Sequence, residues 1–156
     1  MYDTAILIGR FEPVHTGHVA LLREALSRAQ RAIVVVGSAH QPRSPRNPFT
    51  WQEREAMLRG ALPGHDGKRL TVLPVRDYYN EAIWVDAVRQ AVARHTAPQE
   101  RMGLVGHFKD TTSSYLDAFP GWELIRMERQ GGIDATAIRD AYFSATPATL
   151  SAALGV

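Results

Sequence analysis

The chain has 156 residues, of which 45% are hydrophobic and 22% charged, a composition that excludes a disordered tail or a fibrous protein. Its formal charge of +2 gives no support to bulk nucleic-acid binding, and no apolar run approaches the roughly 18 residues of a membrane span. The absence of cysteine excludes disulfides, thiolate metal sites and thiol catalysis.

The length and the first residues indicate one domain in one compartment. A chain of 156 residues can close one sizeable hydrophobic core, so we expect a single domain over residues 1–156. Residues 1–10 lack a basic leader, a long apolar region and a small-residue cleavage site. No secretory signal is visible, and the cytoplasm is the expected location.

The first half of the chain alternates strand and helix patterns. Residues 4–9 and 32–37 are short β-branched and leucine-rich runs that end in glycine. Continuous apolar runs of this length predict buried parallel strands. Between them, helical spacing predicts an amphipathic helix with a buried side made of Val19, Leu22, Leu26 and Ala29. A proline-punctuated loop, 41–49, leads into a capping box of Thr50 and Glu53 that predicts another helix.

The same alternation continues to the end of the chain. The patterns predict strands over 70–75, 102–106 and 122–127, and helices over 82–95, 113–118, 135–143 and from Thr146-Pro147 onward. They favour an α/β fold, a Rossmann-like open and mostly parallel sheet with helices on both faces. Because ligands of such folds bind at the C-terminal ends of the strands, we expect the site in the loops that follow them.

The loop after the first strand carries the strongest functional pattern. Its glycine spacing is neither that of a dinucleotide fold nor that of Walker A. Gly9 and Gly17 would let a ligand approach the backbone, and the helix start at Gly17 and His18 would offer free N–H groups to an anion. His15 and His18 could aim donors at the same anion, for which a phosphate group is the natural occupant.

Two other interpretations of the histidine pair stay open from the residues alone. His15 and His18 could merely cap the helix, or they could bind a metal as neutral ligands. A metal is disfavoured because no third ligand of suitable spacing is nearby and Glu12 alone would make a weak site.

The run from Gly9 to His18, Gly-Arg-Phe-x-Pro-x-His-x-Gly-His, resembles the nucleotidyltransferase superfamily with the His-x-Gly-His motif. Its Arg-Phe-x-Pro part is similar to nicotinamide mononucleotide (NMN) adenylyltransferases of the archaeal type and of the bacterial bifunctional type, in which this domain precedes a Nudix hydrolase. Similar segments follow along most of the chain, at 37–39, 46–50, 53–54, 77–80, 84, 106–110 and 113–122. With 156 residues, we expect no Nudix domain here.

This resemblance implies adenylyl transfer from ATP to NMN, giving NAD and pyrophosphate, with Mg²⁺ carried by ATP and no metal ligand from the protein. His18 would stabilise the α-phosphate, and His15, Arg10 and Arg139 would hold the β- and γ-phosphates. The remaining implied ATP-site residues are Gly9, Phe11, Gly17, Arg46 and Thr136. Asn80 and Trp84 would bind the nicotinamide, through the carboxamide and by ring stacking.

Three of these positions have competing interpretations. The last family motif, Ile-Ser-x-Thr-x-Ile-Arg, has Asp134 in place of its serine, which would cap a helix well but carries a charge unsuited to a triphosphate. Trp84 could simply pack beside the apolar stripe of its helix, and Asn80 could be an ordinary turn residue. Arg43 is either a phosphate contact or a surface charge, and the resemblance does not decide it.

Several functions therefore remain to be separated. Within the superfamily, the acceptor could be nicotinic acid mononucleotide, phosphopantetheine or flavin mononucleotide, although Asn80 and Trp84 favour a nicotinamide ring. A silent ATP- or NAD-binding module is the alternative of a different class, and the two histidines argue against it. The expected partners are small molecules, with neither nucleic acid nor membrane, and a homo-oligomer is possible.

Overall fold

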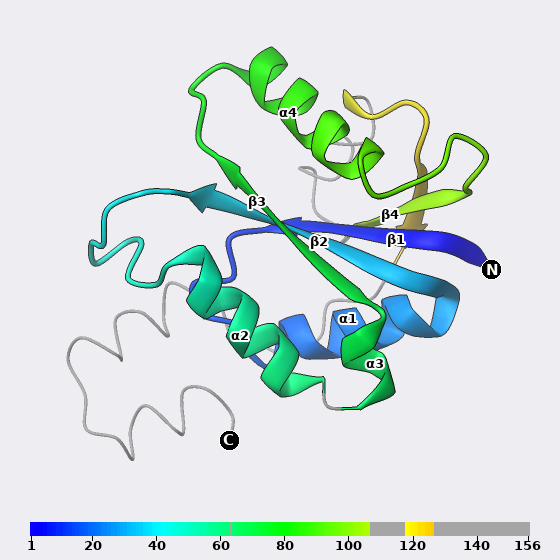
Figure 1. Cartoon of the computed structure of the whole chain (residues 1–156), viewed down its shortest axis with the longest axis horizontal. Helices are drawn as coiled ribbons and strands as arrows, with labels where there is room; N and C mark the ends of the chain where they lie inside the picture. The colour runs from blue at the N-terminus through cyan, green and yellow to red at the C-terminus, as the bar shows by residue number, and fades with distance from the viewer. Residues whose placement is uncertain (63, 107–117, 127–156) are drawn as a thin grey trace.

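The computed structural model describes residues 1–62, 64–106 and 118–126 (Figure 1). Strands and helices alternate along this part of the chain, beginning with a strand. The elements are β1 (Tyr2–Gly9), α1 (Thr16–Arg28), β2 (Ala29–Ala39), α2 (Trp51–Ala61), α3 (His65–Lys68), β3 (Leu70–Arg76), α4 (Glu81–Ala93), β4 (Met102–Gly106) and β5 (Glu123–Arg126).

The described strands form one parallel sheet in the order β3-β2-β1-β4-β5. Strand β1 lies in the middle, where Ile6 pairs with Ile33 of β2 on one side and with Leu104 of β4 on the other. After β3 the chain returns to the opposite side of β1, so the strand order reverses between β1 and β4. The Rossmann-like sheet predicted from the sequence is confirmed, and this reversal is where such folds bind ligands.

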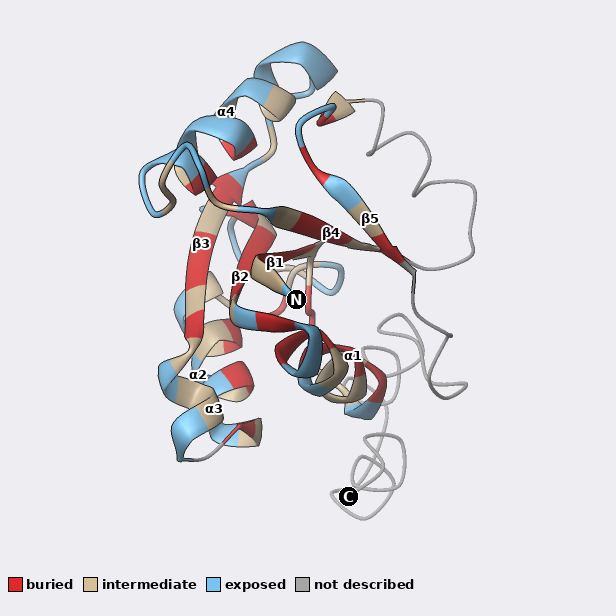
Figure 2. Ribbon diagram, turned by 90° about the vertical axis from the view of Figure 1, so that its right-hand side faces the viewer, coloured by how far each residue is buried: buried red, intermediate tan, exposed pale blue. Residues whose placement is uncertain are grey.

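Two hydrophobic cores lie on opposite faces of the sheet. Helices α1 and α2 cover one face, and α4 covers the other (Figure 1). Because successive strand residues point to opposite faces, Leu7 and Val34 pack with the first pair of helices whereas Ile6 and Ile33 pack with α4. The central strands are buried along most of their length (Figure 2), which explains why their sequences are apolar runs.

The helices begin where capping residues allow them to. The predicted capping box of α2 is confirmed, since Thr50 Oγ1 accepts from the Glu53 N–H and Glu53 Oε1 accepts from the Thr50 N–H. Helices α1 and α4 each span 13 residues. Along the parts of the chain that the structure describes, no helix combines the length and apolarity needed to cross a membrane.

Some predicted boundaries were wrong. Ala29 was placed on the first helix but begins β2, which runs to Ala39 rather than ending at Gly37. Helix α3 was not predicted, because its four residues have no apolar periodicity. The fifth strand begins at Glu123 rather than Trp122. The predicted helices over 135–143 and from Thr146, and all but the last residue of 113–118, lie outside the described residues.

Candidate functional site

Three loops emerge at the C-terminal edge of the sheet, after β1, β2 and β3 (Figure 1). They comprise residues 10–15, 40–50 and 77–80, and they contain most of the predicted site residues of the described chain. The predicted location of the site is therefore a single edge of the sheet. What each side chain does there follows from its contacts.

The two histidines form the start of α1 with their side chains. Nδ1 of His15 accepts from the Gly17 N–H at 3.1 Å and from the His18 N–H at 3.4 Å, and Nδ1 of His18 accepts from the His15 N–H at 3.2 Å. The imidazole rings stack with centroids 3.7 Å apart and planes inclined by 21°. This is a capping box built from imidazoles in place of the usual hydroxyl and carboxylate.

This arrangement corrects one sequence expectation and adds a chemical constraint. The N–H groups of Gly17 and His18, expected to face an anion, donate instead to the His15 ring, because a helix start leaves donors that a nearby acceptor satisfies. A ring nitrogen that accepts a hydrogen bond carries no proton, so each neutral imidazole bears its proton on Nε2. The cap thereby fixes both the orientation and the tautomer of the pair.

The ring of Phe11 supports the histidines from the side. It meets the His18 ring edge-on with centroids 4.6 Å apart, and only 6% of Phe11 is exposed. A Cβ on Gly9 would lie 3.1 Å from Cε2 of Phe11, closer than ordinary packing allows. A side chain at position 9 would therefore require the Phe11 ring to shift by a few tenths of an ångström.

Arg10 joins the first loop to the second. Its Nη2 donates to the Arg46 carbonyl at 2.9 Å and to the Asn47 side-chain oxygen. Arg10 and Arg46 both line a cavity of about 280 Å³, together with Asp77 and Tyr79 from the third loop. The structure therefore brings the two predicted phosphate-binding arginines to one cavity, although they are far apart in the sequence.

A buried ion pair beneath the loops was missed by the sequence analysis. Arg54 of α2 is 1% exposed and Glu12 is fully buried, with Nη1 and Oε1 3.2 Å apart. The same Nη1 donates to the carbonyls of Arg10 and Gly37, at 2.7 Å each. One guanidinium thus ties the loop after β1 to the end of β2.

Burial and the neighbouring charges act on Arg54 in opposite directions. Burial lowers the pKa of Arg54, and the Glu12 carboxylate opposes that shift. A sequence signal for this residue does exist: Arg54, Leu58 and Leu62 follow each other at four-residue spacing, and all three are buried. An arginine on the apolar stripe of a helix indicates a buried partner, but the spacing does not identify Glu12.

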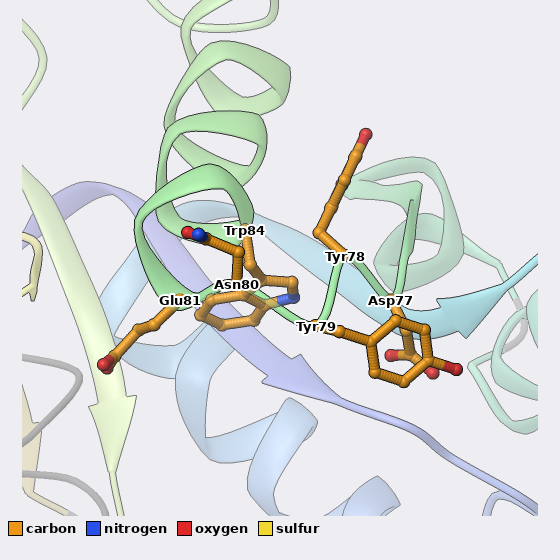
Figure 3. A pocket seen from close by; sticks show the side chains of 6 residues that line it. All are labelled: Asp77, Tyr78, Tyr79, Asn80, Glu81 and Trp84. Atoms are coloured by element: carbon orange, nitrogen blue, oxygen red, sulfur yellow. The ribbon is translucent and has the colours of Figure 1, made fainter.

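The third loop and the start of α4 form a second cavity, of about 420 Å³ (Figure 3). Its lining consists of Asp77, Tyr78, Tyr79, Asn80, Glu81 and Trp84. Asp77 and Tyr79 also border the arginine cavity, so the two hollows adjoin. The predicted nicotinamide residues therefore lie together, next to the cavity that Arg10 and Arg46 line.

Asn80 and Trp84 each have a structural role, and both also border the second cavity. Asn80 is the N-cap of α4, its Oδ1 accepting from the Ile83 N–H at 3.1 Å, so its amide NH₂ is the group that remains as a donor. Trp84 is half-buried, borders the cavity, and packs edge-on against Phe119 with ring centroids 6.3 Å apart. Packing thus holds the indole at the cavity without enclosing it.

Of the remaining predicted residues, one makes contacts within and beside its own loop, and the others lie outside the described part of the chain. Arg43 pairs with Glu53 at 2.8 Å and donates to the Pro48 carbonyl, so it stabilises its own loop. Thr136, Arg139 and Asp134 lie outside the described residues. Among the residues that are described, no three His, Asp or Glu side chains are grouped so that they could hold a metal ion.

An open parallel sheet with paired imidazoles after its first strand and two arginines at a cavity on the same edge is typical of nucleotide-binding α/β proteins. Residues 6–141 match the cytidylyltransferase-like family. The chain belongs to that family.

Similar proteins of known name indicate which members of the family the chain resembles. The chain is 35% identical over 143 residues to the nicotinamide/nicotinic acid mononucleotide adenylyltransferase of Acinetobacter baylyi, covering 91% of this chain and 76% of the relative. It is 37% identical to the nicotinamide-nucleotide adenylyltransferase of Ignicoccus hospitalis, covering 65% of this chain and 60% of the relative. The resemblance to NMN adenylyltransferases is therefore confirmed, for a bacterial and for an archaeal protein.

The structural comparison agrees. The bifunctional NMN adenylyltransferase/ADP-ribose pyrophosphatase of Francisella tularensis superposes with a TM-score of 0.85 at 32% identity, over 92% of this chain. A second structure from that organism, complexed with AMP and a manganese ion, gives a TM-score of 0.84 at 29% identity, over 94% of this chain. The chain spans only 42% and 43% of these two solved chains.

Proposed function

We propose that the protein transfers the adenylyl group of ATP to nicotinamide mononucleotide, producing NAD and pyrophosphate. The observation that carries the proposal is the imidazole pair at the start of α1, whose Nδ1 atoms are committed to the cap. Each neutral ring then has an N–H at Nε2, the kind of donor that stabilises charge on phosphate oxygens. Kinship with NMN adenylyltransferases supplies the reaction class.

In this reaction the 5′-phosphate of the acceptor attacks the α-phosphorus of ATP. A new P–O bond forms on the side of the α-phosphorus opposite the bond to pyrophosphate. That bond breaks, and pyrophosphate leaves with its electron pair. Because the attacking phosphate is already ionised, no general base is required. The protein must position the two substrates and neutralise developing charge, which are large terms in such a transfer.

We assign the phosphates to the first two loops. His18 contacts the α-phosphate, while His15, Arg10 and Arg46 contact the remaining phosphate oxygens, and Gly9, Phe11 and Gly17 shape the backbone beneath them. Arg10 is oriented by the Arg46 carbonyl, which keeps the two guanidinium groups at one cavity. Thr136 and Arg139 complete the ATP site in this proposal.

The nicotinamide occupies the cavity at the start of α4. Its ring stacks on the Trp84 indole, and the amide NH₂ of Asn80 donates to its carboxamide oxygen. This cavity adjoins the arginine cavity, so a mononucleotide bound in it could direct its phosphate toward the bound ATP. A pyrophosphate-release assay with ATP and a panel of mononucleotide acceptors tests the assignment; faster turnover of phosphopantetheine or flavin mononucleotide would redirect it.

Nicotinic acid mononucleotide is a second candidate acceptor, because an NH₂ donor at Asn80 suits a carboxylate oxygen as well as an amide oxygen. Two carboxylates, Asp77 and Glu81, line the same cavity and disfavour a negatively charged ring substituent. We therefore expect a higher kcat/KM for the amide than for the acid. The reverse preference would assign the acid as substrate.

Replacing Trp84 separates stacking from packing. We expect Trp84→Ala to raise the acceptor KM several-fold, since the loss of an aromatic contact of about 0.5 to 1.5 kcal/mol adds to some lost burial. The KM for ATP should change little. Two-substrate kinetics and a thermal melt measure both effects.

The matched control for that variant is Trp51→Ala. Trp51 is also half-buried but packs with the core on the other face of the sheet. Its loss should lower stability without a selective effect on the acceptor. A large fall in Tm for Trp84→Ala with an unchanged acceptor KM would show that the indole only packs.

Asn80 allows its cap and its donor to be tested apart. Asn80→Asp keeps an oxygen for the Ile83 N–H but replaces the NH₂ by a carboxylate oxygen, so helix α4 should keep its stability. We expect the acceptor KM to rise, and turnover of nicotinic acid mononucleotide to fall further than that of NMN. Asn80→Ala should also lose about 1 kcal/mol of stability. Unchanged kinetics in both variants would leave Asn80 as a cap only.

Further features of the proposal concern the metal and the assembly. Mg²⁺ enters with ATP, coordinated mainly by phosphate oxygens and water, and so needs no cluster of protein carboxylates. Residues 1–156 act as a nucleotidyltransferase domain on small-molecule substrates. The cytoplasmic location and a homo-oligomeric state stay predictions.

A further inference from the structure

A third hollow lies between the end of β3 and α4. Figure 3 shows the Tyr78 side chain pointing away from Trp84. Tyr78 borders both the cavity at the start of α4 and this third hollow. The cavity has a volume of about 440 Å³. The polar side chains that line it are those of His40, Arg76, Tyr78, Gln90 and Arg94, and the lining includes no Asp or Glu.

The charge of this cavity is not balanced by carboxylates. Most arginines of the described chain have partners, as Arg28, Arg59 and Arg101 do with glutamates. Within the same described ranges, Arg76 and Arg94 form no ion pair. Asp77, which follows Arg76, accepts from Ser38 Oγ at 3.1 Å and from Gln41 Nε2 at 3.2 Å, and it borders the other two cavities.

Ordinary surface placement explains each cation alone but not their arrangement. Arg94 is the C-cap of α4, where a positive charge is favourable to the helix dipole. Arg76 ends β3, and His40 follows β2 in a left-handed conformation with φ of 64°. The loop after β2, the end of β3 and the end of α4 therefore each contribute a residue with hydrogen-bond donors to this cavity.

We propose that this cavity binds a phosphate-bearing anion, separately from the two substrate cavities. Guanidinium forks at Arg76 and Arg94 match phosphate oxygens in geometry and charge, and the Tyr78 hydroxyl adds a donor. Gln90 Nε2 donates to Asp86 Oδ2 at 2.8 Å, so its second N–H is the one that can face the cavity. The volume lies in the range of small-molecule sites, so the ligand class is a phosphorylated small molecule. This inference does not depend on the proposed transfer reaction.

The test is a titration of the ¹⁵N-labelled protein with inorganic pyrophosphate, followed by amide chemical shifts at constant ionic strength. We expect saturable shifts at Tyr78, Gln90 and Arg94, distinguishable from any shifts near His18. In Arg76→Gln/Arg94→Gln the dissociation constant read at these amides should rise at least tenfold, while turnover stays unchanged and Tm falls only slightly, because the favourable charge at the end of α4 is lost. Arg94→Gln alone should give a smaller rise.

Arg89→Gln is the matched control, because Arg89 is an exposed arginine of α4 that borders a different hollow. It should leave the dissociation constant within about twofold. The proposal is overturned if pyrophosphate causes no saturable shift at Tyr78, Gln90 and Arg94, if the double variant binds as the parent does, or if Arg89→Gln weakens binding equally.

Discussion

His18→Asn should lower kcat by roughly 10² to 10⁴ while the protein keeps its stability, since one oriented donor to developing charge is typically worth that much. Asparagine reaches about as far as Nδ1 of the imidazole, so its oxygen can accept from the His15 N–H, as Nδ1 does at 3.2 Å. Asparagine has no atom in the position of Nε2, so the proposed phosphate donor is lost. Steady-state kinetics with a thermal melt measure the two properties together.

His18→Ala removes both nitrogen functions and should lose a similar factor in kcat plus part of the helix cap. His65→Ala, at the start of α3, is the control for replacing a histidine elsewhere and should leave kcat unchanged. His15→Ala should act more on the KM for ATP. Parental turnover by His18→Asn would limit that ring to a capping role and favour the silent nucleotide-binding module.

Arg54→Met should cost about 3 to 5 kcal/mol of folding stability, because it leaves the Glu12 carboxylate buried without its cationic partner. The carbonyls of Arg10 and Gly37 lose their donor as well. For a chain of this length we expect a fall in Tm of roughly 10 °C or more. Denaturant and thermal unfolding measure it, and the KM for ATP should rise because the Arg10 loop loses its support.

Two further variants identify the cause of that loss. Glu12→Gln added to Arg54→Met removes the buried charge and should recover part of the stability. Arg59→Met, on the same helix, breaks a partly exposed pair with Glu55 and hydrogen bonds to the carbonyls of Gly67 and Leu70, and it should cost less than Arg54→Met because it leaves no buried charge. Equal destabilisation by Arg54→Met and Arg59→Met, with no recovery in the double variant, would contradict the buried-pair interpretation.

The fold could be predicted because its sheet is buried on both faces. Runs such as Ile33–Val36 are apolar at every position since each strand residue meets a helix layer, and that pattern is local in the sequence. Boundaries were less predictable. Ala29 is buried in either a helix or a strand, so its apolar character could not decide between α1 and β2.

The positions of the candidate site residues in the fold could be predicted from the sequence, but their contacts only in part. The positions of His15 and His18 after a buried strand indicated a loop at the sheet edge, which the structure bears out. That their Nδ1 atoms would cap the helix was one of several interpretations left open. The pairing of Glu12 with Arg54 could not be derived, because it depends on how α2 packs under a loop distant in sequence.

The cap has a consequence for catalysis that motif matching does not give. Holding each ring through Nδ1 costs no rearrangement when a substrate arrives, so the proposed Nε2 donors are oriented beforehand. Phe11 and the stacked partner ring restrict the same side chains further. We infer that the first loop holds its imidazole donors in place before substrate binds. Arg54 stabilises this loop through the Arg10 carbonyl and Glu12.

The most direct test of the account is product analysis after incubating the protein with ATP, NMN and Mg²⁺. We predict NAD and pyrophosphate in equal amounts from the parent protein, and at least a hundredfold lower rate from His18→Asn at the same substrate concentrations. Binding of both substrates without any NAD, at concentrations well above the usual micromolar-to-millimolar KM range, would contradict the proposed transfer.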